Sequence, residues 1–253
     1  MTLDSDYSYS KKTLIASPDN NSLSSSLLLF PHEISIGSFK YSYSFKNHYM
    51  SSSLSIINYG EFTDSESHHS FSSSDYILKH TIYKKFNNYI HSSIDLKYIS
   101  STIDDYNSDA IVTKLNLYYH YKRLLIQSFI SNHGFVFNSY TSFQEEVPSS
   151  YGFSILYLPQ YINSIVSITY NIFDDYDMLN FQNEFLVFNQ LSIICGYHSI
   201  AYKLYSGDFN NDFLIGLSIG SSIKYKDYIL GVGLKNLGPI GIISSFTLSK
   251  SIN

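Results

Sequence analysis

The sequence predicts an all-β protein, an antiparallel transmembrane outer-membrane β-barrel of about 14 strands. Three observations lead to this prediction. Segments of roughly ten residues alternate apolar and polar side chains, their connections are alternately long and short, and acidic and basic residues separate between the two kinds of connection. Because successive side chains of a strand point to opposite faces, such segments have one apolar face and one small polar face.

The alternation is clearest near the C-terminus. In residues 213–224, Phe213, Ile215 and Ile219 share one parity, whereas Gly216 and Ser218 share the other. Segments 228–235 and 242–249 repeat this pattern. We therefore expect strands at residues 34–45, 49–59, 75–84, 89–103, 110–120, 123–133, 150–158, 164–173, 181–188, 191–202, 213–224, 228–235 and 242–249.

The connections fall into two classes that alternate along the chain. The short ones are 46–48, 86–88, 121–122, 159–163, 189–190 and 225–227, and the long ones are 60–74, 104–109, 134–149, 174–180 and 203–212. Thirteen of the 21 acidic residues lie in the long connections, and lysines collect at the short ones. Solvation of loops explains the acidity of the long connections, but it explains less well why basic residues collect at the short ones. Bacterial outer-membrane barrels have short periplasmic turns and long outer loops, so the order favours a membrane barrel.

The N-terminal part of the chain completes the strand count. Single-chain bacterial barrels have an even number of strands, and a chain that starts in the periplasm must first cross outward. We expect this crossing at residues 7–16, and a loop or short helix at 17–26 that could instead plug the barrel. The chain is then one domain, with a strand or plug segment at 1–33 and the barrel at 34–253.

Composition excludes several classes of protein. The chain has 25 Tyr and 18 Phe but no Trp, and tyrosine suits a boundary between apolar and wet surroundings. A net charge of -5 argues against a nucleic-acid partner. The single cysteine, Cys195, excludes an internal disulfide. The start at Met1 lacks the pattern of a secretory signal, so we expect either a mature or truncated outer-membrane chain or a soluble β protein.

No motif predicts a catalytic residue, a cofactor or a metal. Asp208, Asn210 and Asp212 have the one-three-five spacing of a calcium loop, but Phe213 stands where the turn glycine belongs. A lipase needs a serine, a histidine and an orienting group on one face, and serine is too abundant here for such a set to be meaningful. We therefore expect a protein that is not an enzyme.

Several segments resemble one family of outer-membrane proteins. Two segments carry the resemblance: IINYGEF at residues 56–62 and FSSSDY at residues 71–76. They resemble the "INYG.F … FSASDY" signature of the PorV/PorQ family of type IX secretion proteins. Residues 93–99, 140–154 and 216–248 are similar to further parts of that family, and residues 14–20 look closer to PorQ. The chain departs from the family at 144–148, where the usual arginine before Leu-Pro is absent, and at 25–29, where an Asn-Pro-Ala segment is missing.

The resemblance implies a barrel related to the FadL-like fatty-acid transporter fold and a role outside catalysis. Family members anchor a surface attachment complex or carry cargo proteins by their C-terminal domains, so the implied partners are outer-membrane lipid and type IX secretion proteins. We expect docking through residues 60–71 and 134–148, because contacts of this kind usually lie on loops and aromatic residues dominate interfaces. The candidate contact residues are Tyr59, Gly60, Phe62, Phe71, Tyr140, Phe143, Glu145 and Pro148.

Two further hypotheses remain open beside the secretion anchor. A passive FadL-like channel for hydrophobic molecules predicts an apolar tunnel or a lateral gap in the wall. A soluble β protein predicts a chain that stays monodisperse in buffer without detergent. For the candidate aromatic residues, a structural role in packing loops over the barrel mouth is as well founded as a docking role.

Overall fold

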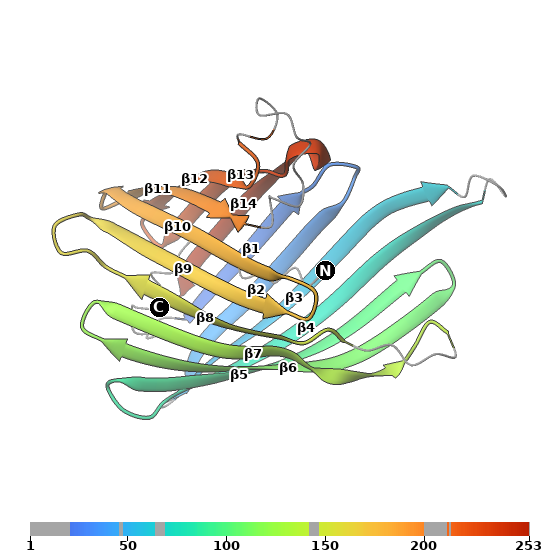
Figure 1. Ribbon diagram of the computed structural model, residues 1–253, viewed down its shortest axis with the longest axis horizontal. Coiled ribbons are helices and arrows are strands. Elements are labelled where there is room, and N and C mark those ends of the chain that lie inside the picture. Colours follow the sequence, from blue (N-terminus) through green and yellow to red (C-terminus); the bar gives the residue numbers. More distant parts are fainter. Residues whose placement is uncertain are drawn as a thin grey trace.

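The computed structural model describes residues 21–45, 48–63, 69–141, 147–199, 212 and 214–252. Within these residues, fourteen strands form one closed antiparallel barrel, in which each strand pairs with its sequence neighbours and β1 pairs with β14 (Figure 1). The strands are β1 Asn21–Leu29, β2 Ser35–Phe45, β3 His48–Thr63, β4 Ser70–Lys85, β5 Ile90–Ile103, β6 Tyr106–Tyr121, β7 Leu124–Asn138, β8 Ser150–Tyr157, β9 Ser164–Phe173, β10 Asp177–Phe188, β11 Leu191–His198, β12 Leu217–Tyr225, β13 Tyr228–Asn236 and β14 Ile242–Ile252.

The apolar face of the strands points outward. On β12, Leu217 and Ile219 are 40% and 58% exposed, whereas Gly220, which follows Ile219, is buried. The same alternation continues on β13, where Leu230 is 56% exposed and Gly231 is buried. A soluble β protein buries its apolar face, so this arrangement is that of a membrane barrel with lipid outside and small or polar side chains inside.

The thirteen strands predicted beyond residue 33 are all present, but the fourteenth was placed wrongly. It is β1, residues 21–29, which pairs Leu27 with Phe246 on β14 and with Gly37 on β2. The predicted strand 7–16 lies outside the described residues. The loop or helix expected at 17–26 is wrong for residues 21–26. These residues are mostly serine, so the sequence shows little alternation even though Leu27 and Leu29 face lipid.

Two connections expected to be long are short. β5 and β6 are joined through Asp104 and Asp105 alone, and β9 and β10 are joined through residues 174–176. Polar residues extend the pairing here, as where the Thr102 hydroxyl donates a 2.8 Å hydrogen bond to Asn107 Oδ1. Outside a bilayer, strands no longer need an apolar face, so alternation fades before the strand ends. β12 instead begins later than expected, after Gly216 with its φ of 83°.

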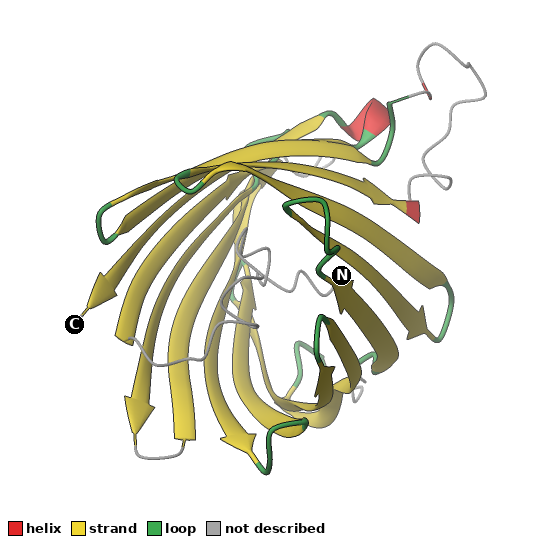
Figure 2. Ribbon diagram, turned by 90° about the vertical axis from the view of Figure 1, so that its left-hand side faces the viewer, coloured by secondary structure: helices red, strands yellow, loops and turns green. Residues whose placement is uncertain are grey.

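The wall of the barrel is taller on one side (Figures 1 and 2). Strands β3 to β7 have 14 to 16 residues, whereas β8, β9, β11, β12 and β13 have 8 to 10. A membrane-spanning strand needs about 9–11 residues. The tall side therefore projects beyond the bilayer at the end that carries the acidic connections, and we call this end the outer rim.

Charge and aromatic residues mark the opposite end. Lys84, Lys122, Lys226 and Lys250 lie there, and each ammonium group sits 5.1 to 5.5 Å from the centre of an aromatic ring. Aromatic girdles of this kind are typical of the membrane boundary in barrels. Among the described acidic residues, Glu33, Glu61, Asp104, Asp105, Asp109, Asp174, Asp175 and Asp177 lie at the outer rim. The separation of charge expected from the sequence therefore places the acidic connections at the outer rim and these lysines at the opposite end of the barrel. No helix in the described part of the chain is long and apolar enough to cross a bilayer.

Candidate functional site: the lumen and its outer rim

Four of the predicted contact residues lie on strands. Tyr59, Gly60 and Phe62 belong to β3, and Phe71 belongs to β4. Phe62 and Phe71 are direct partners whose rings stack with centroids 5.5 Å apart, and Phe62 is 42% exposed. The segment was expected to be a loop, but its hairpin is paired almost to the tip because Thr63 and Ser70 also pair.

The remaining candidates are dispersed. Pro148 is exposed just before β8, and Tyr140 follows β7. Phe143 and Glu145 lie outside the described residues. The structure therefore brings Tyr59, Gly60, Phe62, Phe71 and Tyr140 to the outer rim, and Pro148 lies at the same end, in the connection between β7 and β8.

Two of these tyrosines take part in a hydrogen-bond network at the lumen side of the rim. The Tyr59 hydroxyl donates a 2.7 Å hydrogen bond to Asp75 Oδ2, and the Ser101 hydroxyl donates to Asp75 Oδ1. The Tyr140 hydroxyl in turn donates to Ser101. Hydrogen bonds to an ionised acceptor are among the stronger ones, so the segment after β7 is held against β4 and β5. This contact supports the structural role weighed for Tyr59 and Tyr140.

Asp75 and Ser101 were missed by the sequence reasoning. The signal was present, because Asp75 has the same parity as Ile77, which packs inside the barrel. A carboxylate on the inward parity of a strand needs a hydrogen-bond donor. Its donors could not be named from the sequence, since Ser101 lies 26 residues away and Tyr140 a further 39.

Gly60 shapes the rim in a different way. Its φ of 84° lies in the left-handed region, and the pairing of β3 with β4 shifts between Asn58 and Glu61 at this point. The Asn58 side chain accepts a 2.9 Å hydrogen bond from the Gly60 amide. The bulge borders an open polar depression of about 400 Å³, lined by Glu33, Asn58, Gly60, Glu61, Ser70, Phe71 and Ser72.

Inside the barrel, apolar side chains form a stripe along the wall. At the outer rim, Leu28, Ile36 and Ile57 are direct partners on β1, β2 and β3, and all three are buried. Ile77 packs against them and is itself paired with Ile99. The members of this apolar stripe are Leu28, Ile36, Ile57, Ile77, Ile99, Ala110, Val112 and Phe129.

The stripe leads toward a second apolar cluster at the opposite end. This cluster comprises Tyr118, Leu125, Leu156 and Ile165, with Tyr83 and Leu158 packed against it. Phe129 lies between the two in register, because it is the partner of Asn116, two residues before Tyr118. Between the two groups, at the level of Thr81, Asp95 and Lys114, the inward side chains of β4 to β6 are polar, so the apolar side chains gather toward each end of the lumen.

The opposite wall of the lumen carries small side chains. Inward positions on β11 to β14 include Gly196, Gly220, Gly231, Gly233, Ser218, Ser222 and Ser245. Serines on this wall form hydrogen bonds across strands: the hydroxyls of Ser192 and Ser222 are 2.8 Å apart, and the Ser245 hydroxyl donates to the carbonyl of Gly233.

A cationic group lies on the inward face of β2, β4, β5 and β6. Lys79 and Lys97 are 8% and 7% exposed, and they are direct cross-strand partners. Lys40 lies on the same row, because Ser53 of β3 is the partner of both Lys40 on β2 and Lys79 on β4. Lys114 is the partner of Asp95, and its ammonium group lies 4.6 Å from the centre of the Phe129 ring. We refer to Lys40, Lys79, Lys97 and Lys114 as the lysine cluster.

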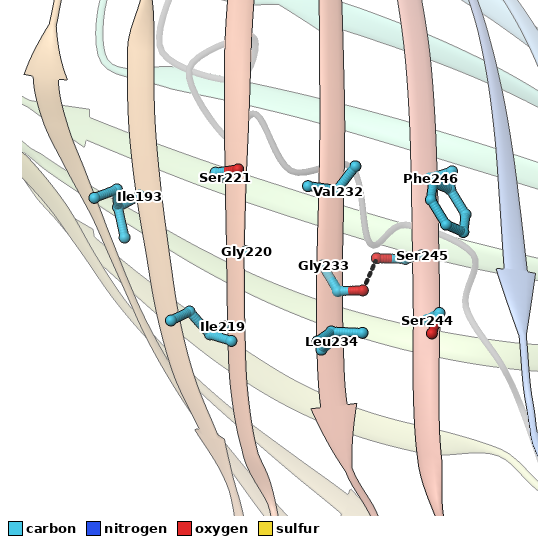
Figure 3. A pocket seen from close by; sticks show the side chains of 10 residues that line it. All are labelled: Ile193, Ile219, Gly220, Ser221, Val232, Gly233, Leu234, Ser244, Ser245 and Phe246. Carbon is cyan, nitrogen blue, oxygen red and sulfur yellow. Dashed lines mark hydrogen bonds between the residues drawn. The ribbon is translucent and has the colours of Figure 1, made fainter.

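The outer wall has a shallow apolar depression over β11 to β14 (Figure 3). Its volume is about 480 Å³, and small residues such as Gly220 and Gly233 form its floor. The surrounding apolar residues are Ile193, Ile219, Val232, Leu234 and Phe246. Because these side chains face outward, the depression belongs to the lipid-facing surface and not to the lumen.

No group of three or more metal-binding side chains occurs among the described residues. Asp208 and Asn210 of the incomplete calcium spacing lie outside them, whereas Asp212 is buried. Ser52 and His80 form a serine–histidine pair on the outer face, with Oγ and Nδ1 2.9 Å apart. A catalytic set needs a third group to orient the histidine.

Comparison with solved structures identifies the fold. The toluene transporter TodX of Pseudomonas putida matches with a TM-score of 0.65 at 9% identity, covering 95% of this chain and 92% of that one. The toluene transporter TbuX of Ralstonia pickettii matches with a TM-score of 0.64 at 9% identity, covering 95% and 93%. A FadL homologue of Pseudomonas aeruginosa matches with a TM-score of 0.54 at 6% identity, covering 92% and 88%.

No protein-family model matches the sequence, and no curated protein sequence does. The likeness to solved structures is therefore one of fold, at identities too low to carry function. The chain is a closed antiparallel β-barrel of the FadL-like outer-membrane type.

Proposed function

We propose that this protein is a passive channel of a Gram-negative outer membrane for hydrophobic small molecules. The observation that carries the proposal is the apolar stripe on the lumen wall, together with the apolar cluster of Tyr118, Leu125, Leu156 and Ile165 toward the opposite end. Apolar side chains on the inner face of a membrane barrel are unusual, because water-filled lumens are polar. Such side chains lower the free energy of an apolar solute at the levels where they lie.

The route is through the lumen and not through the wall. Every described strand pairs on both sides, so no lateral gap opens between strands in the part of the chain that the structure describes. The small side chains of β11 to β14 lie on the wall across the lumen from the stripe. The structural neighbours TodX and TbuX, which are toluene transporters, support an apolar solute as the class to test first.

The test measures entry of an uncharged apolar probe into intact cells. Cells that express this protein in the outer membrane are expected to take up 1-N-phenylnaphthylamine faster than cells without it. Replacing Ile77 and Ile99 by asparagine removes two paired members of the stripe and should slow the initial fluorescence rise by about tenfold, the equivalent of about 1.4 kcal/mol.

The matched control is Ile229→Asn. Ile229 is inward and half-buried on β13, away from the stripe, so this variant should keep the rate of the unsubstituted protein. Surface expression of each variant is checked by its heat-dependent mobility on gels. Uptake no faster than in cells without the protein, or equal loss in both variants, contradicts the channel.

We also propose a second role, as a secretion anchor that binds type IX secretion proteins or their cargo at the outer rim. It is supported by the sequence resemblance at residues 56–62 and 71–76, and by the exposed Phe62, which stacks on Phe71 at the tip of the projecting β3–β4 hairpin. Exposed aromatic side chains on a projecting, rigid element are suited to an interface.

Replacing both Phe62 and Phe71 by serine should abolish recovery of a surface partner when the protein is purified from its own cells. Tyr106→Ser is the control, since Tyr106 is an exposed aromatic residue at the same end but at the start of β6. Partner recovery that survives loss of both phenylalanines argues against this rim as the docking surface.

A further inference from the structure

We propose that the outer face of β3 and β4 binds a second copy of this chain within the membrane, through the Ser52–His80 pair. This surface is separate from the lumen, so it does not depend on the proposed channel. Leu54, which shares the parity of Ser52, is 44% exposed, and Leu78 and Ile82 on either side of His80 are 52% and 42% exposed. Because these neighbours face lipid, Ser52 and His80 also lie on the lipid-facing side of the wall.

The pair lies near the middle of the membrane. Ser52 is four residues after His48, where β3 begins, and His80 is four residues before Lys84, near the short-turn end of β4. A strand that spans the hydrocarbon has about 9–11 residues, so both side chains lie well inside it. Hydrocarbon offers no hydrogen-bond partner at this depth, and neither lipid headgroups nor bulk water reach it.

The two side chains satisfy each other only in part. Ser52 Oγ and His80 Nδ1 are 2.9 Å apart, and within the described residues neither side chain has a further hydrogen bond. A hydroxyl and a neutral imidazole each have one donor and at least one acceptor. If the hydroxyl donates to Nδ1, then Nε2–H remains as a donor and Oγ as an acceptor, and in the other tautomer these two roles are exchanged. In either case one donor and one acceptor remain on the lipid-facing surface.

A second copy turned about a two-fold axis supplies the missing partners. An isologous interface sets a surface against itself, so each contact is made twice. An axis along the membrane normal, passing between β3 and β4, places β3 of each copy against β4 of the other. Nε2 of His80 then meets Oγ of the partner's Ser52, and the same hydrogen bond forms in reverse. Every remaining donor and acceptor of the two pairs is satisfied, whereas a lipid chain satisfies none of them.

The side chains around the pair allow this close approach. Ser52 is the direct partner of Tyr41 on β2 and of His80 on β4, so the smallest side chain of the row stands between two rings. Small residues let two transmembrane surfaces come together. Met50, the next outward residue of β3, has a flexible side chain that adapts to a partner. The face therefore has a polar centre and apolar, adaptable surroundings, which suit a protein contact.

The outer face on another side of the barrel shows the contrast. On β8 and β9 every outward position is aromatic or aliphatic. These residues are Tyr151, Phe153, Ile155, Tyr157, Val166, Ile168, Tyr170 and Ile172. Lipid alone covers such a surface well. The β3–β4 face instead carries an ionisable side chain, and ionisable residues at membrane depth usually pair with another protein group.

Sedimentation equilibrium of the full chain in an uncharged detergent tests the contact. The unsubstituted protein is expected to sediment with twice the chain mass of 29.0 kDa. H80F and S52A each remove both reciprocal hydrogen bonds and should raise the dissociation constant of the dimer by about tenfold. Both replacements suit a lipid-facing position, and heat-dependent mobility on gels checks that each variant folds.

N183L is the matched control. Asn183 also lies on the outer face, on β10 between the exposed Phe181 and Phe185, and it has no place in the proposed contact. Its replacement removes a polar side chain from lipid and should leave the dissociation constant unchanged. An equal loss of dimer in N183L would contradict a contact specific to β3 and β4.

Cross-linking in intact outer membranes decides whether the contact forms in a bilayer. In a C195S background, which removes the single native thiol, L54C lies one outward position from the pair and should be joined to itself by a short dimaleimide reagent. V232C, on the outer face of β13, should remain uncoupled. Addition of H80F to L54C should reduce the coupled product.

Three results would overturn the second copy. One is coupling of L54C no greater than that of V232C. Another is association of H80F and S52A equal to that of the unsubstituted protein. The third is a coupled L54C product whose mass differs from twice that of the chain, because it would assign the surface to a different protein. The uptake experiment concerns the lumen, so the channel and the dimer can fail independently.

Discussion

Replacing Leu96 by arginine is expected to destabilise the folded barrel in lipid bilayers by about 3 kcal/mol. Leu96 is 51% exposed on β5, and its outward neighbours along the strand are Ile94 and Tyr98. An arginine at this depth places its charge in hydrocarbon, where the cost is greatest at the midplane of the bilayer. Urea titration of the protein refolded into vesicles measures the change in free energy of unfolding.

The same substitution near the short turns provides the depth control. Tyr121 is also outward and 45% exposed, but it ends β6 beside Lys122. Tyr121→Arg should cost only about 0–1 kcal/mol, because an arginine there reaches the lipid headgroups. Equal costs at both positions, or no cost at Leu96, would contradict the assignment of this face to the lipid.

Gly134→Ala is expected to cost about 3 kcal/mol through overpacking between β6 and β7. A Cβ atom at Gly134 would overlap the carbonyl oxygen of Ile111 and lie 2.6 Å from the Cα of Val112. Both are backbone atoms of the facing strand, so neither can move without loss of strand pairing. Thermal unfolding in detergent should show a lower midpoint, and amide exchange should rise on β6 and β7.

Gly37→Ala is the matched control for this position. Gly37 also lies within a strand, on the outward side of β2, and a Cβ there meets no atom within 4 Å. Because glycine in a strand loses more conformational freedom on folding than alanine, this variant should be neutral or more stable by a few tenths of a kcal/mol, less than the roughly 0.5–1 kcal/mol typical for such a change. A cost at Gly37 equal to that at Gly134 would show that crowding is not the cause.

Some strands could be predicted in detail because one side chain in two faces lipid. β9 begins and ends where the sequence places it, and β2, β5 and β8 differ by a single residue at one end. β1 was misplaced because serine occupies both its inward and its outward positions, so its sequence does not alternate between apolar and polar residues. The ends of β3, β4, β6 and β7 were cut short because these strands continue past the bilayer, where no solvent difference imposes an apolar face.

The rim was predicted only in part. Tyr59, Phe62, Phe71 and Tyr140 do lie at the outer rim, but the bonds to Asp75 and Ser101 that hold two of them could not be predicted. A carboxylate on an inward parity indicates that donors are near. Which donors they are depends on strands that are distant in the sequence and on the β3 bulge at Gly60.

The sequence by itself determined the lipid-facing side of the strands that alternate clearly, such as 228–235 and 242–249, and which end of the barrel carries acidic residues. Both follow from local patterns: a period of two and the order of connections. It did not determine the inward face of 123–133 and 191–202, which have apolar residues on both parities. Only the tertiary structure decided the contents of the lumen. The register aligns Lys40, Lys79 and Lys97 on one row and joins Leu28, Ile36 and Ile57 on another. Register arises from pairing along every strand at once, and closure of β1 on β14 removes any freedom to slip.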